Sequence, residues 1–126
     1  VWTHEDWQCL EAALKDREDI AILADEVYAQ LVFDGRTHTS VLQYPSLRAR
    51  AFAIYSFGKS LHATGWKMGY CVAPPALAQR FRTLHQYLAF STNAPMQKAV
   101  ADYLALPQPE PPHAVLGRKR DLFLDL

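Results

Sequence analysis

The chain has 126 residues, half of them hydrophobic, and its 13 basic and 13 acidic residues give a formal net charge of zero. This balance offers no attraction for nucleic acid or an anionic membrane surface, and no apolar run reaches the roughly 18 residues that a membrane span needs, so small-molecule chemistry is favoured. Cys9, Cys71 and the five histidines lack metal-ligand or redox spacing, which predicts no metal site and is typical of reduced thiols in a cytoplasmic protein.

The first predicted elements are a helix and a buried strand. Thr3 followed three residues later by Asp6 is a helix-start signature, and apolar residues recur at helical spacing from Trp7 onwards. We therefore expect a helix over residues 4–16. Residues 20–24 are all apolar, and a short continuous apolar run is typical of a strand covered on both faces, as in a parallel sheet.

Two strands are expected to bring polar side chains to one place. Asp25 follows directly after the first apolar run, and residues 31–38 are expected to form a turn and loop. A second apolar run over residues 51–55 predicts the next strand, which leads into Ser56 and Lys59. Open α/β sheets bind ligands beyond the carboxyl ends of their strands, so these positions favour a binding role.

The second half of the chain predicts one more strand and then helices. Two prolines close the strand, and the helix after it has apolar residues at helical spacing. Four prolines within six residues are typical of a hinge or linker. The expected elements are a strand at 68–73, helices at 76–90 and 96–106, a hinge at 107–112 and a last helix at 118–126.

Five side chains near the ends of the first two strands suit a pocket for pyridoxal 5'-phosphate (PLP). The amine of Lys59 can attack the aldehyde of this cofactor. A carboxylate at Asp25 can keep the ring nitrogen protonated, so that the ring accepts the electrons released when a substrate loses its α proton. Tyr28 can donate a hydrogen bond to the ring oxygen, and the hydroxyl of Ser56 and the ammonium of Lys67 can bind the phosphate.

Each of these residues also has a structural interpretation. A lysine after a strand is usually a solvated surface residue, Asp25 could cap a turn, and Tyr28 could be a packed aromatic. Ser56 could satisfy backbone donors, and Lys67 could be a surface charge. Glu26 is interpreted as structural. Three glycines are interpreted as positions of tight backbone geometry, namely Gly58, Gly65 and Gly69.

Three segments together carry a resemblance to a known family. Residues 25–28 (DEVY) precede residues 56–59 (SFGK), with the aspartate and the lysine 34 positions apart, and residues 64–70 (TGWKMGY) follow. This combination resembles the class I/II aminotransferases of fold type I, nearest the branch of the methionine and kynurenine aminotransferases. The position of Lys67 is often lysine in that branch.

The resemblance implies an α/β fold, a three-layer sandwich with a mostly parallel sheet, as part of the large domain of a PLP-dependent transferase. Residues 1–106 would form the central part of the PLP-binding large domain, residues 107–112 a hinge, and residues 113–126 the start of a helix leading to the small domain. The family's subunit is about three times longer than this chain, so we expect a fragment. The resemblance also implies a homodimer in the full-length parent, in which Phe90 would reach a substrate in the neighbouring subunit.

The resemblance implies an activity as well. Lys59 would be the catalytic residue, and the amino group of a methionine-like, aromatic or kynurenine-like amino acid would pass to a 2-oxo acid. A carbon–sulfur β-lyase on the same fold is the enzymatic alternative, although Tyr28 favours transfer because lyase relatives more often have histidine there. A truncated fragment without catalysis is the other alternative. The cofactor-binding residues would be Asp25, Tyr28, Ser56, Lys59 and Lys67.

Overall fold

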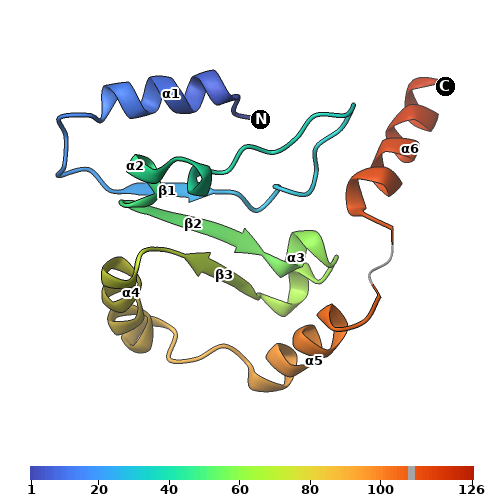
Figure 1. Ribbon diagram of the computed structural model, residues 1–126. Coiled ribbons are helices and arrows are strands. Elements are labelled where there is room, and N and C mark those ends of the chain that lie inside the picture. The colour runs from blue at the N-terminus through green and yellow to red at the C-terminus, as the bar shows by residue number, and fades with distance from the viewer. Residues whose placement is uncertain (108–109) are drawn as a thin grey trace.

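The computed structural model describes residues 1–107 and 110–126. Within these residues, helices lie around a three-stranded sheet. Figure 1 shows α1 and α2 near β1 and α4 near β3, and α5 and α6 come after α4 in the chain. In chain order the elements are α1 (His4–Ala13), β1 (Ile22–Asp25), the 3-10 helix η1 (Val41–Gln43), α2 (Pro45–Arg48), β2 (Ala51–Ser56), α3 (Phe57–Ser60), the 3-10 helix η2 (Thr64–Trp66), β3 (Gly69–Val72), α4 (Pro75–Leu88), α5 (Ala94–Leu104) and α6 (Pro112–Leu124).

The sheet is mixed, with strand order β1-β2-β3. β2 pairs parallel with β1, where Asp25 lies opposite Ile54, and antiparallel with β3, where Ser56 lies opposite Gly69. One of the two strand pairs is parallel, so the prediction of a mostly parallel sheet is confirmed only in part for this segment. The connection between β1 and β2 is long enough for the crossover that a parallel pair needs. The connection between β2 and β3 contains only the short helices α3 and η2, so the chain reverses direction and the pair is antiparallel.

One face of the sheet holds the hydrophobic core. Small residues of β1 and β2 let Trp7 of α1 and the segment of η1 and α2 approach closely, and Val41 and Leu47 are almost completely buried there. The indole N–H of Trp7 donates to the carbonyl of Thr39 at 3.0 Å, so its polar atom is satisfied. The buried cluster consists of Trp7, Ala24, Val41, Tyr44, Leu47, Ala51 and Ala53.

Helix α1 begins where the sequence predicts and ends earlier. Thr3 and Asp6 form a capping box, in which Thr3 Oγ1 accepts from the Asp6 amide at 3.3 Å and Asp6 Oδ2 accepts from the Thr3 amide at 2.7 Å. The predicted start is thus confirmed. The helix ends at Ala13 instead of residue 16, because the Lys15 amide bonds to the Ala12 carbonyl in a tighter, 3-10-type turn.

The opposite face of the sheet is covered only in part. Phe52 of β2 contacts Phe81 of α4, with ring centroids 6.2 Å apart. Leu23 of β1, on the same face, is 73% exposed. The prediction of a strand near residues 20–24 is confirmed by β1, but the prediction that this strand is covered on both faces is wrong for this chain.

A turn between β1 and η1 receives the C-terminal helix. Asp34 and Gly35 both have positive φ, which agrees with the turn expected within residues 31–38. Arg120 of α6 donates two hydrogen bonds to the Asp34 carboxylate, at 2.9 and 3.1 Å, and its guanidinium lies 5.3 Å from the centre of the Phe33 ring. These contacts hold α6 beside the turn.

Helices α4 and α5 begin close to their predicted positions, whereas α6 does not. Asn93 caps α5 by accepting a hydrogen bond from the Met96 amide at 3.1 Å. Helix α6 begins at Pro112, several residues before the predicted 118. Gln108 and Pro109 of the predicted hinge lie outside the described residues.

No helix in the described part of the chain has the length and apolar character that a bilayer crossing requires.

Candidate active site

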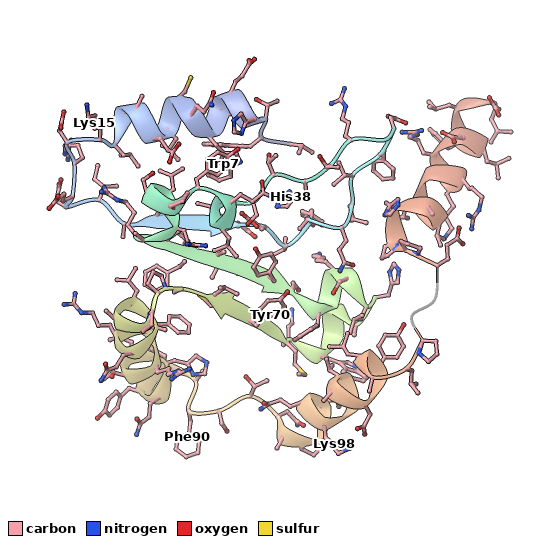
Figure 2. The ribbon with its side chains drawn as sticks, viewed as in Figure 1. Trp7, Lys15, His38, Tyr70, Phe90 and Lys98 are labelled. Carbon is pink, nitrogen blue, oxygen red and sulfur yellow. The ribbon has the colours of Figure 1, made fainter. Side chains whose placement is uncertain are left out.

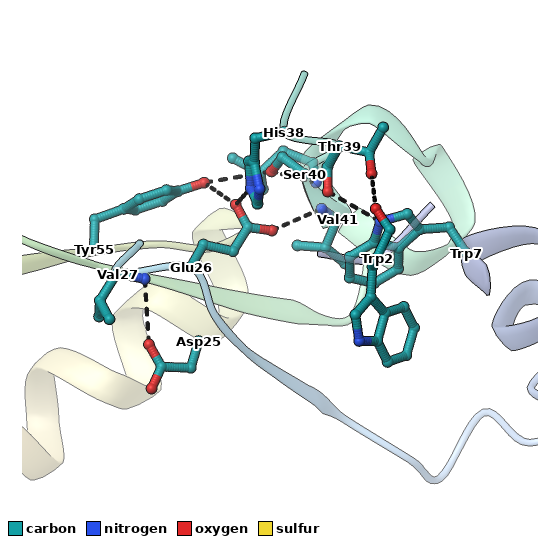
Figure 3. Close-up of polar contacts among 11 residues, drawn as sticks. Trp2, Trp7, Asp25, Glu26, Val27, His38, Thr39, Ser40, Val41 and Tyr55 are labelled. Carbon is teal, nitrogen blue, oxygen red and sulfur yellow. Dashed lines mark hydrogen bonds and ion pairs between the residues drawn. The ribbon is translucent and has the colours of Figure 1, made fainter. Parts of the chain in front are cut away.

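Asp25 and Ser56 end two neighbouring strands and share one face of the sheet. Side chains alternate along a strand, so Asp25 lies on the face opposite Glu26, and Ser56 on the face opposite Tyr55. Figure 3 shows the Asp25 carboxylate directed away from Glu26. Asp25 is exposed, and its Oδ1 accepts a hydrogen bond from the Val27 amide at 3.3 Å. The register therefore brings a carboxylate and a hydroxyl to adjacent strand ends.

Lys59 and Tyr28 come together beside this edge. Lys59 lies on α3, directly after β2, and Tyr28 lies in the turn after β1, where its carbonyl accepts from the Leu31 amide at 2.8 Å. The Nζ of Lys59 is 5.5 Å from the centre of the Tyr28 ring. Lys59 is half-buried and Tyr28 is exposed. The Lys59 amine therefore lies over the Tyr28 ring.

Two of the three glycines are required by close backbone contacts. A Cβ at Gly58 would lie 2.8 Å from Thr64 Cα, and one at Gly69 would lie 2.4 Å from the Tyr55 carbonyl oxygen. Both positions are therefore tight, as predicted. A Cβ at Gly65 would have no neighbour within 4 Å, so the same prediction is wrong for Gly65.

The fold brings the segment of Lys67 beside the segment of Ser56, and Lys67 has an unusual backbone conformation. The Phe57 amide, next to Ser56, donates to the carbonyl of Met68 at 3.1 Å, which draws the two segments together. Lys67 is exposed and has a φ of 54°, in the left-handed region. Non-glycine residues seldom adopt this conformation, and those that do cluster at functional sites.

Phe90 lies apart from the other predicted site residues. It follows α4, is 81% exposed and has a φ of 61°. Figure 2 shows its ring beyond α4, directed away from the sheet. Within this chain Phe90 therefore makes no site with Lys59.

Glu26 is the centre of a buried polar cluster that the sequence did not indicate. Its carboxylate accepts from the Tyr55 hydroxyl at 2.7 Å and from the Val41 amide at 2.8 Å, and lies 3.2 Å from Nε2 of His38 (Figure 3). Burial raises the pKa of Glu26, but these hydrogen bonds outweigh burial and the net pKa is lowered. Burial and the bond to Glu26 raise the pKa of Tyr55 to about 12. The partners are far apart in sequence, and no spacing rule connects them.

Two clefts border the sheet. A cleft of about 390 Å³ is lined by Asp25 and Tyr28 together with Leu23 and Trp2. A larger one of about 920 Å³ is lined by Tyr55, Ser56, and parts of α5 and α6, but not by Lys59, Asp25 or Tyr28. Neither cleft is lined by all of the predicted groups, because the smaller one lacks Lys59 and Ser56 and the larger one lacks Lys59, Asp25 and Tyr28.

The family model for aminotransferase class I and II matches residues 1–113. The chain belongs to this family. The family is PLP-dependent.

Individual relatives point to one branch of the family. The chain is 44% identical to the methionine aminotransferase of Escherichia coli over 130 aligned positions, which cover 99% of this chain and 33% of that protein. It is 41% identical to mouse kynurenine–oxoglutarate transaminase 1 over 92 positions, covering 73% of this chain and 22% of that one. A crystal structure of an E. coli methionine aminotransferase matches 99% of this chain with a TM-score of 0.86. The matched part of the chain thus spans about a third of the E. coli protein and about a fifth of the mouse protein.

Proposed function

We propose that this chain is the central part of the PLP-binding large domain of an aminotransferase. In the whole protein, the domain would transfer an amino group from a methionine-like, aromatic or kynurenine-like amino acid to a 2-oxo acid. The names of the relatives support the methionine-like and kynurenine-like parts of this range. The observation that carries the proposal is the pairing of Lys59 with Tyr28, 5.5 Å apart, beside strand ends that present Asp25 and Ser56 on one face.

The residues present fit the cofactor. Lys59 offers the amine for the aldehyde, Asp25 a carboxylate for the ring nitrogen and Tyr28 a phenol for the ring oxygen. Ser56 and Lys67 offer a hydroxyl and a permanent positive charge, which is the donor set that a phosphate requires. When bound, PLP supplies an electron sink for the substrate's α carbon.

The chain's own residues would then bind, orient and move a proton. Lys59 would be the nucleophile towards the cofactor and, once released by the substrate amine, the base that moves the α proton through Nζ. Asp25 would hold the ring-nitrogen proton, and its place at the end of β1 orients it towards the same face as Ser56. Lys59 is half-buried, so part of its side chain is withdrawn from water.

The proposal includes the setting of this segment in a longer protein. Residues 1–106 would be central to a three-layer large domain, residues 107–112 a hinge and residues 113–126 the start of the helix leading to the small domain. The uncovered face of β1, with Leu23 73% exposed, would pack against the rest of the large domain. Phe90 would reach the substrate pocket of the second subunit of a homodimer, which its 81% exposure permits.

A labelling experiment tests the cofactor role of Lys59. The chain is incubated with PLP and reduced with borohydride, and peptide mass spectrometry locates the pyridoxyl group. We expect the label on Lys59, little label in Lys59→Ala, and unchanged labelling of Lys59 in Lys15→Ala, which removes an exposed lysine on the opposite side of the core. Equal labelling of several surface lysines would contradict the proposal.

An activity assay tests the reaction. The longest protein that contains this sequence is supplied with methionine and a 2-oxo acid, and the new amino acid is measured together with pyruvate and ammonia. Amino-group transfer that Lys59→Ala abolishes supports the proposal. The β-lyase alternative needs a second amino acid, an S-substituted cysteine, because its sulfur leaves from the β carbon whereas methionine carries sulfur on the γ carbon. Release of pyruvate and ammonia from the S-substituted cysteine, without transfer from methionine, would assign the β-lyase reaction instead.

A further inference from the structure

We propose that Glu26 is a positioning residue for the cofactor site, holding the ends of β1 and β2 in a fixed relation from the face opposite Asp25 and Ser56. This inference rests on the proposed function for its purpose, but its structural content can be measured without any cofactor. Glu26 would not touch the cofactor. It would act through Asp25, which precedes it in the chain, and through Ser56, which follows its hydrogen-bond partner Tyr55.

Glu26 is bonded to β2 through both its backbone and its side chain. Its amide donates to the carbonyl of Ile54 at 3.0 Å, and its carboxylate accepts from the hydroxyl of Tyr55, the next residue, at 2.7 Å. These two bonds extend the strand pairing one residue beyond the last register pair, Asp25 with Ile54. The two strand ends are therefore fixed together at the point where the site begins.

Holding Glu26 against Tyr55 also fixes the residues on the other face. Asp25 precedes Glu26, Ser56 follows Tyr55, and side chains alternate between the faces of a strand. The hydrogen bonds of the paired strands restrict the backbone on both sides, so a shift of residue 26 relative to residue 55 would move Asp25 relative to Ser56. The two groups expected on one cofactor are thus aligned by a bond on the far face.

The cluster is anchored to the core of the chain. The second carboxylate oxygen of Glu26 accepts from the Val41 amide at 2.8 Å, and Val41 is completely buried. Thr39, two residues before Val41, accepts from the indole N–H of Trp7 through its carbonyl and donates its hydroxyl to the Trp2 carbonyl at 2.6 Å, which ties this loop to α1 (Figure 3). The strand ends are therefore held to the buried core and not only to each other.

Packing alone does not account for a carboxylate at this position. Glu26 is 5% exposed, and burial of a charge is costly unless every oxygen is hydrogen-bonded. An apolar side chain of the same volume would fill the space at less cost. An apolar side chain could not accept hydrogen bonds from both the Tyr55 hydroxyl and the Val41 amide. These two bonds link the end of β1 to β2 and to the segment of η1.

The test compares Glu26→Gln and Tyr55→Phe with Glu18→Gln, which makes the same chemical change at an exposed glutamate. Amide hydrogen exchange is followed at residue 26, which bonds to Ile54, and at Phe57, which bonds to Met68. Uptake of PLP at Lys59 and the absorbance spectrum of the bound cofactor are measured on the same samples. We expect about tenfold faster exchange at both amides and about tenfold weaker PLP uptake in the first two variants, with no change in Glu18→Gln.

The readouts separate positioning from general stability and from the cofactor role. All comparisons use conditions under which circular dichroism shows the variants folded, and a changed absorbance spectrum of bound PLP in a folded variant is an effect that lost stability alone does not produce. If Glu26→Gln does not fold, Tyr55→Phe carries the test, because it leaves the bonds of Glu26 to Val41 and His38 in place.

Wild-type exchange rates at residues 26 and 57 in Tyr55→Phe would overturn the inference. So would faster exchange with PLP uptake and spectrum unchanged, because Glu26 would then stabilise the strands without positioning the site. If the wild-type chain takes up no PLP at Lys59, the proposed function fails, and the exchange rates still decide whether Glu26 holds the strand ends.

Discussion

Gly69 of β3 lies opposite Ser56 of β2. A methyl group there would sit 2.4 Å from the backbone oxygen of Tyr55, so Gly69→Ala must push the two strands apart. We expect it to lower the free energy of unfolding by about 2–3 kcal/mol, the cost typical of overpacking, as measured by urea titration followed by tryptophan fluorescence. Gly65→Ala is the control, because nothing lies within 4 Å of its Cβ, and we expect a change within about 0.5 kcal/mol. Equal effects at the two positions would contradict the geometry.

Glu26 makes a second residue-scale prediction, which concerns pH. Its pKa in the folded chain is lowered from the usual 4.5, because hydrogen bonds to the carboxylate outweigh the effect of burial. A lowered folded pKa adds stability above the unfolded pKa, and that stability is lost as the pH falls through the folded value. The unfolding free energy of the wild type should therefore fall towards that of Glu26→Gln as the pH decreases below about 4.5. A difference between the two that stays constant from neutral to acid pH would show that charge is not involved.

At the scale of elements, the sequence predicted a helix or strand correctly where the signal for it lies within one short segment of the chain. The start of α1 was predictable because Thr3 and Asp6 bond to each other, and the strand before Asp25 because its apolar run is continuous. The segment of η1 and α2 was not predicted, although it places Val41 and Leu47 in the core. Its helices have three and four residues, too few for any periodicity to appear.

The candidate site divides in the same way. Because Asp25 and Ser56 each follow an apolar run, the sequence predicted that both lie at the same edge of the sheet. The register of β1 and β2 agrees with this prediction. The bonds of Glu26 to His38 and Tyr55 join residues 12 and 29 positions away, so only the folded chain reveals them. The direction of β3 was missed because a short apolar run looks the same in a parallel and an antiparallel pair.

Helix α4 allows a prediction about how one element is held. None of its residues is fully buried, and its ring contact with the sheet joins Phe81 to Phe52. Phe81→Ala should therefore loosen α4, with faster amide exchange along residues 75–88 and a loss of about 1–2 kcal/mol in unfolding free energy, below the cost of a fully buried phenylalanine. Leu84→Ala, on the same helix but 64% exposed, should change stability by less than about 0.5 kcal/mol. If the two variants lose equal stability, the Phe52 contact does not hold the helix.

At the scale of the whole molecule, the sheet is covered well on one face and poorly on the other. Trp7 and Leu47 close the first face, while Leu23 remains exposed on the second. The chain spans about a third of its E. coli relative, and a segment of that size is expected to leave uncovered the surfaces that the remaining two thirds would occupy. The proposed setting in a larger domain therefore has a physical consequence for the chain by itself.

That consequence is self-association through the outer side of α4. Leu84, Tyr87 and Leu88 recur at helical spacing and are 64%, 82% and 87% exposed, which forms a continuous apolar stripe of the kind that soluble monomers rarely display. We expect sedimentation velocity to show oligomers that increase with protein concentration, and the double replacement of Tyr87 and Leu88 by serine to reduce them several-fold. Gln86→Ser makes a similar change to helix propensity on the same helix without removing apolar surface, so it should associate like the wild type. Association that persists undiminished in the double variant would place the contact elsewhere on the chain.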